Sequence, residues 1–446
     1  MKIIIAGAGE VGTHLAKLLS GEKQDIILMD ESDDRLSGVG NNFDLMMVNL
    51  PPTSISGLKE AGVADADLFI AVMPEESRNM TACMLATSLG AKKTVARIDN
   101  YEYLLPRHKE FFSRLGVGSL IYPEMLAAHD IVDAMKVSWI RQWWEFAGGA
   151  LILIGTKIRA TAEILNIPLM DLGRQRLPMH IVAIKRGNET IIPRGDDCIR
   201  LNDLIFVVTT KKYIPVIRKL AGKEHYPEIR NVMIMGGSRI SIRATQLMPD
   251  FMKTKIIEVD MNRCHWLTEQ VDDNVMIING DGRDIELLTE EGIKNTEAFV
   301  ALTDNSETNI LACLAAKRMG VTKTVAEVEN VDYINMAESL DIGTVINKKF
   351  IAASHIYQMM LEADVSNVKC LTFADADVAE FKVKADAPVT RGPVRSLGLP
   401  KGVAIGGLIR AGEGMLVTGN TVIQEGDHVV VFCLSQMIRK IEKYFN

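Results

Sequence analysis

Short apolar runs alternate with amphipathic stretches through the first part of the chain. Apolar runs cover 2–6 and 25–30, and between them, over 11–19, apolar residues recur at helical spacing. Strands that alternate with helices in this way are typical of a parallel sheet with helices on both faces. The series continues with strands at 45–48, 68–72 and 94–98, and with helices near 34, at 55–62 and at 77–88.

The pattern changes after Trp144. Short apolar stretches at 181–185, 189–193 and 204–209 follow one another and are separated by turns that contain glycine or proline. Short strands joined by such turns indicate a β-rich fold rather than a continuation of the alternating pattern. We interpret this stretch as a separate small α+β domain.

The whole order of elements occurs twice in the chain. Residues 3–7 match 232–236, residues 58–63 match 288–293, and Asn79 matches Asn309. Residues 27–30 match 257–260, which pairs Asp30 with Asp260. Because self-similarity of this kind indicates a duplicated structural unit, we predict an α/β protein. Two Rossmann-like parallel-sheet domains, at 1–137 and 225–365, are each followed by a small α+β C-terminal domain, at 138–224 and 366–446.

Charge and hydropathy narrow the range of partners. The chain has 50 basic and 57 acidic residues, a net charge of -7, and no long basic run. Binding to a nucleic-acid backbone requires a basic surface, so we expect no nucleic-acid partner. No apolar stretch approaches the roughly 18 residues that would cross a bilayer. Residues 3–5 are typical of a buried strand and not of a signal peptide, so direct membrane insertion is not expected either.

The cysteines do not form a recognisable metal-binding pattern. They are scattered, with no C-x-x-C pair and no clustered histidines beside them. We expect reduced, mostly buried thiols in a cytosolic protein, with a metal–thiolate site as the alternative. The six are Cys83, Cys198, Cys264, Cys313, Cys370 and Cys433.

The first predicted strand runs directly into a glycine loop with the spacing G-x-G-x-x-G. Gly7 would allow a tight turn, Gly9 would let the backbone approach a pyrophosphate, and Gly12 would allow close helix packing. Because the loop follows a strand and opens a helix, it predicts a dinucleotide site with phosphates at the helix N-terminus. The alternative is that the glycines serve only the packing of helix on strand. The loop consists of Gly7, Ala8, Gly9, Glu10, Val11 and Gly12.

An acidic residue stands at the end of the second predicted strand. Asp30 lies 18 positions after Gly12, close to the spacing of the acid that binds the ribose hydroxyls in dinucleotide-binding folds. The same carboxylate would repel a 2'-phosphate, which disfavours NADP(H). We therefore predict NAD(H) at the first site, with ATP or ADP as possible ligands at either site.

The second copy of the loop departs from the glycine pattern. Ser238 and Ser241 replace the second and third glycines, and their side chains would crowd a pyrophosphate in the standard pose. Arg239 could offer a guanidinium to phosphates instead, and Asp260 is the acid we match to Asp30. Two interpretations stay open, a modified nucleotide site and an empty structural copy. The loop consists of Gly236, Gly237, Ser238, Arg239, Ile240 and Ser241.

Beyond the glycine loops, the sequence offers no arrangement of residues suited to catalysis. No histidine, cysteine or lysine is placed as a hydride-transfer acid or as a covalent nucleophile. His14, on the first predicted helix, is better explained by a structural role. We therefore predict a protein that is not an enzyme. An NAD-dependent oxidoreductase with its substrate site between the repeats is the alternative.

The loop, the repeat and the small domains recur together in an order that resembles the TrkA family. These proteins are NAD-binding regulatory components of bacterial Trk potassium-uptake systems, built from two tandem regulator-of-potassium-conductance units. The resemblance covers essentially all 446 residues. It implies a cytoplasmic regulatory subunit that senses nucleotides, gates a Trk-type membrane potassium-translocating subunit, and reaches the inner face of the cell membrane through that partner. It also implies self-assembly as a tetramer or dimer. A nucleotide-binding scaffold for some other transporter is a further alternative.

The resemblance also suggests roles for individual residues. Arg97, at the end of a strand, would face the nucleotide phosphates; the alternative is a surface arginine paired with a helix end. Met73 stands where the family often has a threonine, which the second unit retains as Thr303, and Asp281 belongs to a glycine–aspartate turn that the first unit lacks. Residues 123–124 resemble a segment in which some relatives place a carboxylate near a cation.

Overall fold

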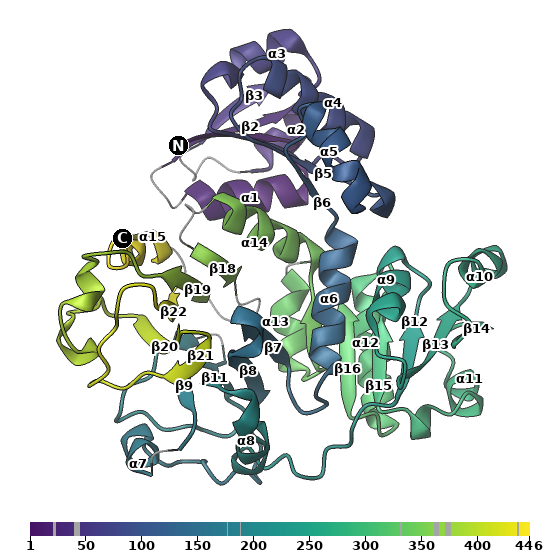
Figure 1. Ribbon diagram of the computed structural model, residues 1–446. Coiled ribbons are helices and arrows are strands. Elements are labelled where there is room, and N and C mark those ends of the chain that lie inside the picture. Colours follow the sequence, from purple (N-terminus) through teal and green to yellow (C-terminus); the bar gives the residue numbers. More distant parts are fainter. Residues whose placement is uncertain are drawn as a thin grey trace. The chain divides into compact units, whose positions relative to one another are not determined.

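The computed structural model describes residues 1–20, 24–39, 45–175, 177–187, 189–330, 332–360, 365–370, 376–434 and 437–446 (Figure 1). The sheets in this part of the chain are two six-stranded parallel sheets and two five-stranded antiparallel sheets. The chain divides into two compact units, one formed by 1–126 with 348–361 and the other by 127–347 with 362–446. The predicted α/β class, with two Rossmann-like sheets, is confirmed.

The first parallel sheet has the strand order β3-β2-β1-β4-β5-β6. The order reverses beside β1, and in open α/β sheets ligands bind at the carboxyl ends of the strands at such a point. The central strand is fully buried through Ile3, Ile4 and Ile5, as expected for a sheet covered on both faces. The strands are β1 (Lys2–Ala6), β2 (Asp25–Asp30), β3 (Met46–Asn49), β4 (Leu68–Ala71), β5 (Thr94–Arg97) and β6 (Ser119–Ile121).

Helices accompany this sheet in the predicted order. They are α1 (Glu10–Ser20), α2 (Asp33–Ser37), α3 (Ile55–Glu60), α4 (Glu76–Ser88), α5 (Pro106–Arg114) and α6 (Pro123–Met135), with the short 3-10 helices η1 (Val63–Asp65) and η2 (Tyr101–Leu104). A later segment, α14 (Lys348–Met360), also belongs to this unit and packs against α1. The helix that follows the glycine loop is therefore covered by a helix from the second repeat.

The contact between α1 and α14 has an aromatic and an ionic part. The ring of His14 lies 4.1 Å from the ring of Phe350, centroid to centroid, and the ammonium of Lys349 pairs with the Glu10 carboxylate. Burial and the nearby charge of Lys17 lower the pKa of His14 to about 4, so this imidazole is neutral near pH 7. His14 therefore acts as a packing residue, as expected.

The second parallel sheet repeats the first, with the order β14-β13-β12-β15-β16-β17. Its strands are β12 (Asn231–Met235), β13 (Lys253–Glu258), β14 (Val275–Asn279), β15 (Ala298–Ala301), β16 (Lys323–Glu327) and β17 (Thr344–Ile346). Its helices are α9 (Arg239–Leu247), α10 (Met261–Thr268), α11 (Ile285–Glu290), α12 (Ser306–Arg318) and α13 (Asp332–Ser339), with η5 (Ile293–Asn295). The duplication predicted from the sequence is therefore present in the fold.

Two antiparallel sheets follow the parallel ones. The first, in the order β10-β9-β11-β8-β7, uses β7 (Gln142–Phe146), β8 (Leu151–Lys157), β9 (His180–Arg186), β10 (Glu189–Ile191) and β11 (Leu204–Thr209), with α7 (Leu169–Arg174), α8 (Ile214–Leu220), η3 (Ala147–Gly149) and η4 (Lys211–Tyr213). The second, in the order β18-β19-β22-β20-β21, uses β18 (Val365–Cys370), β19 (Ala376–Lys382), β20 (Val403–Arg410), β21 (Glu413–Leu416) and β22 (His428–Leu434), with α15 (Ile438–Glu442), η6 (Pro388–Thr390) and η7 (Val394–Ser396).

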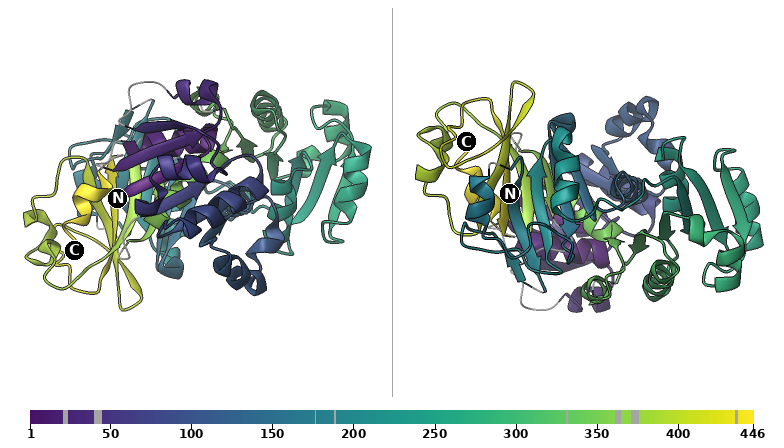
Figure 2. Two further views of the ribbon diagram at one scale, coloured as in Figure 1. Left: turned by 90° about the horizontal axis from the view of Figure 1, so that it is seen from above. Right: turned by 90° about the horizontal axis from the view of Figure 1, so that it is seen from below.

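These two antiparallel sheets lie side by side and touch through β20 (Figure 2). A Cβ on Gly406 would lie 2.8 Å from Val208 and 3.1 Å from Val182, so the absence of a side chain allows the close approach. In addition, a ring nitrogen of His180 lies 3.2 Å from the carbonyl oxygen of Gly406. The small domains thus form one packed pair, while the exact domain boundaries at 137, 224 and 365 stay a prediction.

Each small domain carries the same internal ion pair. The Arg186 guanidinium donates two hydrogen bonds to the Asp203 carboxylate, of 3.0 and 2.8 Å, and Arg410 donates two to Asp427, of 2.8 and 2.7 Å. Both aspartates are buried. Arg186 and Arg410 therefore have the same structural role in the two small domains.

Candidate functional site

The first glycine loop connects β1 to α1 at the carboxyl edge of the first sheet. Gly7 has φ +111°, a conformation that favours glycine, and a Cβ there would lie 3.0 Å from the backbone nitrogen of Met73. A Cβ on Gly12 would lie only 1.8 Å from the carbonyl oxygen of Gly7. The roles predicted for these two glycines, the tight turn and the close packing of helix on strand, are therefore confirmed.

Gly9 differs from the other two because it faces open space. A Cβ built on Gly9 would have no atom within 4 Å among the described residues. Helix α1 begins at the next residue, Glu10, and the first N–H groups of an α-helix have no acceptor within the helix. The space in front of Gly9 is thus bounded by N–H donors at the positive end of α1, an arrangement suited to an anion.

Asp30 is fixed at the carboxyl end of β2 beside the loop. Its side chain is buried; one oxygen accepts a 2.7 Å hydrogen bond from the backbone N–H of Ala8, and the other accepts a 2.9 Å bond from the N–H of Ser32. Arg35 lies 3.6 Å away. A carboxylate can accept about four hydrogen bonds, so this acid keeps acceptor capacity for the hydroxyls of a ribose.

A buried asparagine that was not among the predicted site residues holds the neighbouring strand ends together. The Asn79 amide donates to the carbonyl oxygens of Met73 and Arg97, both at 2.9 Å, and accepts a 2.8 Å bond from the N–H of Met73. It thereby joins the ends of β4 and β5 next to the glycine loop. The signal in the sequence that could have identified Asn79 is its match with Asn309 in the second repeat.

Arg97 lies at the end of β5 with partners of its own. One guanidinium nitrogen is 3.0 Å from Asp99 and another is 3.5 Å from the carbonyl oxygen of Met73. The side chain is 22% exposed, so the guanidinium is neither deeply buried nor free of the surrounding chain. Its contact with phosphates stays a prediction.

An ion pair spans the point where the strand order reverses. Arg78, near the start of α4, donates two 2.9 Å hydrogen bonds to the carboxylate of Glu31, which follows β2. Because β1 lies between β2 and β4, this pair connects the two sides of the loop. Neither residue was predicted, since nothing in the local sequence indicates that they meet.

The second glycine loop is filled by its own side chains. The hydroxyl of Ser238 accepts a 3.3 Å hydrogen bond from the N–H of Ser241 and so caps α9. The hydroxyl of Ser241 donates a 2.6 Å bond to the carbonyl oxygen of Gly236, which is the equivalent of Gly7. The first loop leaves open space in front of the N–H groups of its helix. In the second loop, one helix N–H already donates to the hydroxyl of Ser238.

Other residues close around the same loop. A Cβ on Gly237 would lie 2.3 Å from a methyl carbon of Leu267, and Arg263 donates a 2.9 Å hydrogen bond to the Gly237 carbonyl oxygen. Ile240 is buried, whereas Arg239 is exposed at the first residue of α9. The side chain of Arg239, the cationic residue predicted for the second site, is therefore exposed to solvent.

The predicted equivalence of Asp30 and Asp260 is wrong. In the first sheet Ala6 pairs with the residue before Asp30, and in the second sheet Met235 pairs with the residue before Glu258. Since Ala6 and Met235 are equivalent, the counterpart of Asp30 is Glu258. The strand register, which is fixed by backbone hydrogen bonds, differs by two residues from the alignment that brought the two aspartates together.

The hydrogen bonds of Glu258 support this correction. Its carboxylate accepts a 2.7 Å bond from the N–H of Gly237 and a 2.9 Å bond from the N–H of Asp260, as Asp30 does from the equivalent residues. Asp260 itself is the N-cap of α10 and accepts a 2.8 Å bond from the N–H of Asn262. Its observed role is to begin a helix, and a contact between Asp260 and a cofactor stays a prediction.

In the second sheet, Asn309 makes the hydrogen bonds that Asn79 makes in the first. Asn309 donates to the carbonyl oxygens of Thr303 and Glu327, at 2.8 and 2.9 Å, and accepts a 2.6 Å bond from the Thr303 hydroxyl. A Cβ on Gly236 would lie 3.2 Å from the methyl group of Thr303. The structure thus brings Gly236 and Thr303 together, just as it brings Gly7 and Met73 together.

Asp281 is engaged in a local ion pair. Its carboxylate accepts a 2.7 Å hydrogen bond from the Arg283 guanidinium and a 2.9 Å bond from the Arg283 N–H. Hydrogen bonds from the side chain and then the backbone of Arg283 lower the pKa of Asp281 below its ordinary value. A nucleotide contact made by Asp281 would have to compete with this pairing.

The described residues contain no group of three or more histidine, cysteine, aspartate or glutamate side chains that could hold a metal ion. Cys83 and Cys313 are buried free thiols, and burial raises the pKa of both, that of Cys313 to about 12. Glu124, at the start of α6, is buried, and its Oε2 has no hydrogen-bond partner in the described part of the chain. A cation near Glu124 stays a prediction.

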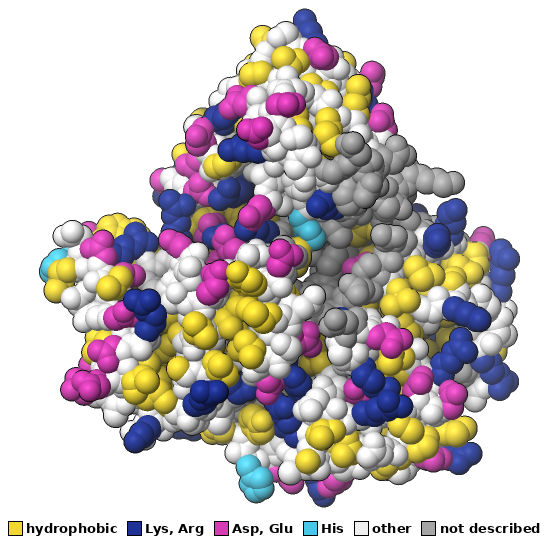
Figure 3. All heavy atoms as spheres, turned by 180° about the vertical axis from the view of Figure 1, so that it is seen from behind, with side chains coloured by type: hydrophobic (Ala, Val, Ile, Leu, Met, Phe, Trp, Pro, Cys, Tyr) yellow, Lys and Arg dark blue, Asp and Glu magenta, His cyan; other side chains and the backbone are white. Residues whose placement is uncertain are grey.

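Acidic and basic side chains are both spread over the face of the molecule drawn in Figure 3. None of the helices in the described ranges is long and apolar enough to cross a bilayer.

Comparison with protein families gives matches along most of the chain. Residues 3–123 and 232–348 each match the family model described as the TrkA-N domain, and residues 378–446 match the TrkA-C domain. The repeated match corresponds to the two parallel sheets with their glycine loops.

Curated relatives are similar over the full length. The chain is 30% identical to the Trk system potassium uptake protein TrkA of Haemophilus influenzae, covering 100% of this chain and 98% of the relative. It is 32% identical to the protein of the same name from Vibrio alginolyticus, covering 98% and 96%. It is 31% identical to that of Halomonas elongata, covering 100% and 98%.

Solved structures resemble the fold at low sequence identity. The crystal structure of the GsuK RCK domain matches with a TM-score of 0.59 at 16% identity, covering 100% of this chain and 94% of that one. The GsuK channel bound to NAD matches with a TM-score of 0.58, also at 16% identity, covering 100% and 78%. At this identity the likeness concerns the fold alone.

Proposed function

The chain belongs to the TrkA family, and on that premise we propose that it is a nucleotide-sensing regulatory subunit that gates a membrane potassium-transport system. It acts on a Trk-type membrane potassium-translocating subunit from the cytoplasmic face of the membrane. It assembles with itself, as a tetramer or a dimer. The relatives named above are potassium uptake proteins, and no arrangement of the described residues favours an oxidoreductase.

The single observation that carries nucleotide sensing is the open space in front of Gly9. This space faces the N-terminus of α1, and the buried Asp30 carboxylate stands at the end of the adjacent strand. A pyrophosphate in that space would accept hydrogen bonds from the helix N–H groups, and the ribose hydroxyls would donate to Asp30. We assign NAD(H) to this site, because a 2'-phosphate would meet the Asp30 charge.

For the second site we favour the structural copy over a dinucleotide site. The Ser238 hydroxyl already accepts from a helix N–H, and the Ser241 hydroxyl bonds the loop carbonyl of Gly236. A pyrophosphate in the standard pose would have to displace the cap that Ser238 provides. ATP or ADP at this site would need another pose, with the exposed Arg239 as the cation that it could reach.

The contact between α1 and α14 suggests how binding is transmitted. Glu10 is the first residue of α1, next to the proposed phosphate site, and its carboxylate pairs with Lys349 of α14. A bound pyrophosphate adds negative charge beside Glu10 and so changes the electrostatic environment of Lys349. Since α14 belongs in sequence to the second repeat, a shift of α14 alters the connection between the repeats.

The magnitude of such a switch is limited by differential affinity. A ligand shifts two arrangements only by the ratio of its affinities for them, and moving a population from 1:99 to 99:1 requires roughly 5.5 kcal/mol. In an oligomer with several nucleotide sites, each site would need to supply only part of this difference in binding free energy.

The test is potassium flux into liposomes that contain the Trk-type membrane subunit, with and without this protein, at a series of NADH, NAD and ATP concentrations. We expect the protein to change the flux and at least one nucleotide to modulate that change. Flux that is the same with and without the protein, at every nucleotide concentration, would contradict the proposal. Absorbance at the nicotinamide band in the same samples checks for turnover of the cofactor, which we expect to be absent.

A further inference from the structure

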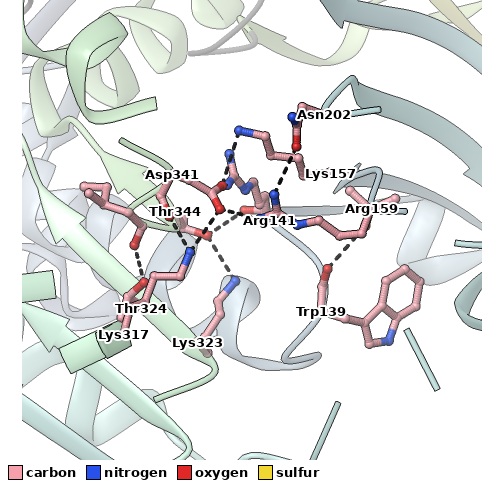
Figure 4. A network of polar contacts seen from close by, with 12 residues as sticks. Trp139, Arg141, Lys157, Arg159, Asn202, Lys317, Lys323, Thr324, Asp341 and Thr344 are labelled. Carbon is pink, nitrogen blue, oxygen red and sulfur yellow. Dashed lines mark hydrogen bonds and ion pairs between the residues drawn. The ribbon is translucent and has the colours of Figure 1, made fainter. Parts of the chain in front are cut away.

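Six cationic side chains line one cavity in the second compact unit, and none of them belongs to a glycine loop. Figure 4 shows the contacts of Asp341 at this cavity. Three of the cations come from the start of the first small domain and its strand β8, two from α12 and β16 of the second parallel sheet, and one from the segment after α8. The cations are Arg141, Lys157, Arg159, Lys223, Lys317 and Lys323.

Asp341 is shared among four of these cations. It pairs with Arg141 and Arg159, and its oxygens lie 3.3 Å from the ammonium of Lys157 and 3.2 Å from that of Lys317. Burial alone would raise the pKa of Asp341, but the charges of Arg141, Lys317 and Arg159 hold it well below its ordinary value. One carboxylate is therefore surrounded by far more positive charge than it neutralises.

The other two cations have uncharged hydrogen-bond partners. Lys323 is 3% exposed, and its ammonium donates to the carbonyl oxygen of Ile140 and, at 3.0 Å, to the hydroxyl of Thr344. Lys223 is also 3% exposed and lies 3.2 Å from the hydroxyl of Tyr226. Buried charges are normally paired with an opposite charge, because burying an unpaired ion is costly. Even with Glu338 counted beside Asp341, this cluster has more cations than carboxylates.

A cavity of about 70 Å³ lies at the centre of the cluster. This volume is several times the roughly 10–15 Å³ that a single water requires. Besides the six cations, its lining includes Ser138, Thr322 and Thr324, whose hydroxyls donate to the backbone carbonyl oxygens of Pro227, Glu297 and Ile342. The donors that the walls offer to a small anion are therefore the cationic groups.

We propose that this cavity is an anion site that binds a phosphate group, either free inorganic phosphate or the terminal phosphate of a small metabolite. A tetrahedral dianion offsets two of the excess positive charges and suits the guanidinium forks of Arg141 and Arg159, which can donate two parallel hydrogen bonds to phosphate oxygens. A carboxylate or chloride would leave more of the positive charge unbalanced. This site is separate from the glycine loops and does not depend on the function proposed for them.

Occupation of the site would couple parts of the chain that are far apart in sequence. Arg141 and Arg159 belong to the first small domain, whereas Lys317 and Lys323 belong to the second parallel sheet. Asp341 already bridges Arg141, Arg159 and Lys317, and a bound dianion would add negative charge that attracts the cations of both domains. Phosphate would therefore stiffen the connection between these two domains and act as a second regulatory ligand.

Proton uptake should accompany binding. Burial and the charge of Arg141 lower the pKa of Lys323 to about 7, and burial and the charges of Arg159 and Arg141 lower that of Lys223 to about 8. The charged and titratable groups that face these lysines are the other four cations with Asp341, Glu338 and the Tyr226 phenol. A dianion would raise both lysine pKa values, so affinity should increase as the pH falls from about 9 to 7.

The test is calorimetric titration of the full chain with inorganic phosphate, at constant ionic strength maintained with chloride. A parallel titration with ribose 5-phosphate distinguishes free phosphate from a phosphate monoester as the ligand. We expect binding to the wild type, with proton uptake visible as a dependence of the heat on buffer ionisation. Arg159→Gln should weaken binding at least tenfold, and Lys323→Met should abolish it.

The matched control is Lys294→Met, which removes an exposed lysine outside the cluster and should leave phosphate affinity within twofold. Gly9→Ser, which alters the first glycine loop, should also leave it unchanged. If Lys323→Met does not fold, Arg159→Gln decides alone, because Arg159 is partly exposed. The proposal is overturned if neither anion binds the wild type, if Arg159→Gln binds as tightly as the wild type, or if Gly9→Ser abolishes the signal.

Discussion

Replacing Gly9 by serine would give the first glycine loop the side chain that the second loop already has at Ser238. In the second loop the serine hydroxyl accepts from a helix N–H and caps α9. A Cβ on Gly9 meets no described atom within 4 Å, so the substitution introduces no clash with the protein itself. We therefore expect Gly9→Ser to fold normally and to lose affinity for NADH.

The two effects differ in size. Serine and glycine at a helix N-cap differ by only a few tenths of a kcal/mol, so the free energy of unfolding should change by less than about 0.5 kcal/mol. A hydrogen bond to a charged group contributes about 1.5–3 kcal/mol. Loss of one N–H contact to the pyrophosphate should therefore raise the Kd for NADH by roughly 10- to 100-fold, since about 1.4 kcal/mol corresponds to a factor of ten.

Fluorescence titration with NADH measures the affinity, and denaturant unfolding measures the stability of the same samples. Gly173→Ser is a matched control, because Gly173 in α7 also has no described atom within 4 Å of a Cβ, and its NADH affinity should equal that of the wild type. Gly12→Ala provides the opposite case, since its Cβ would strike the Gly7 carbonyl, and overpacking costs typically about 1–3 kcal/mol. A Gly9→Ser protein that binds NADH within twofold of the wild type would refute the placement of the pyrophosphate.

Three further predictions concern other parts of the chain. Asp30→Asn should weaken NADH binding and raise the affinity for NADPH relative to NADH, because the carboxylate that repels a 2'-phosphate is gone; competitive titration with both cofactors measures this. Lys349→Met should leave the Kd for NADH within about threefold but reduce the nucleotide dependence of potassium flux, since Glu10 loses its partner in α14. Stability should increase as the pH rises from 7 to 10, because unfolded lysine still holds the proton that folded Lys323, with its pKa lowered to about 7, has released. Lys323→Met should reduce that slope in denaturant unfolding, and an equal slope in both proteins would contradict the pKa assigned to Lys323.

Much of the fold was predictable from the sequence because its signals are local. The apolar run at 3–5 followed by the glycine loop indicates a buried strand entering a helix, and both are present. The match of Asn79 with Asn309 is also confirmed, because both amides join equivalent strand ends through the same hydrogen bonds.

The errors and omissions come from long-range contacts. Asp260 was matched to Asp30 because the residue type is the same, but backbone pairing between strands sets the register and selects Glu258. The packing of α14 on α1 joins segments more than 300 positions apart, and no local pattern indicates it. The cationic cluster escaped prediction for the same reason, since Arg141 and Lys323 are remote in sequence and neither lies in a basic run.

The most direct test of the proposed function is potassium flux through the reconstituted Trk-type membrane subunit, measured with wild-type protein and with Gly9→Ser as NADH is added. We predict that NADH changes the flux supported by the wild type and that Gly9→Ser gives no response at the concentration that saturates the wild type. An equal response from both proteins, or no response from the wild type, would contradict a regulatory nucleotide site at the first glycine loop.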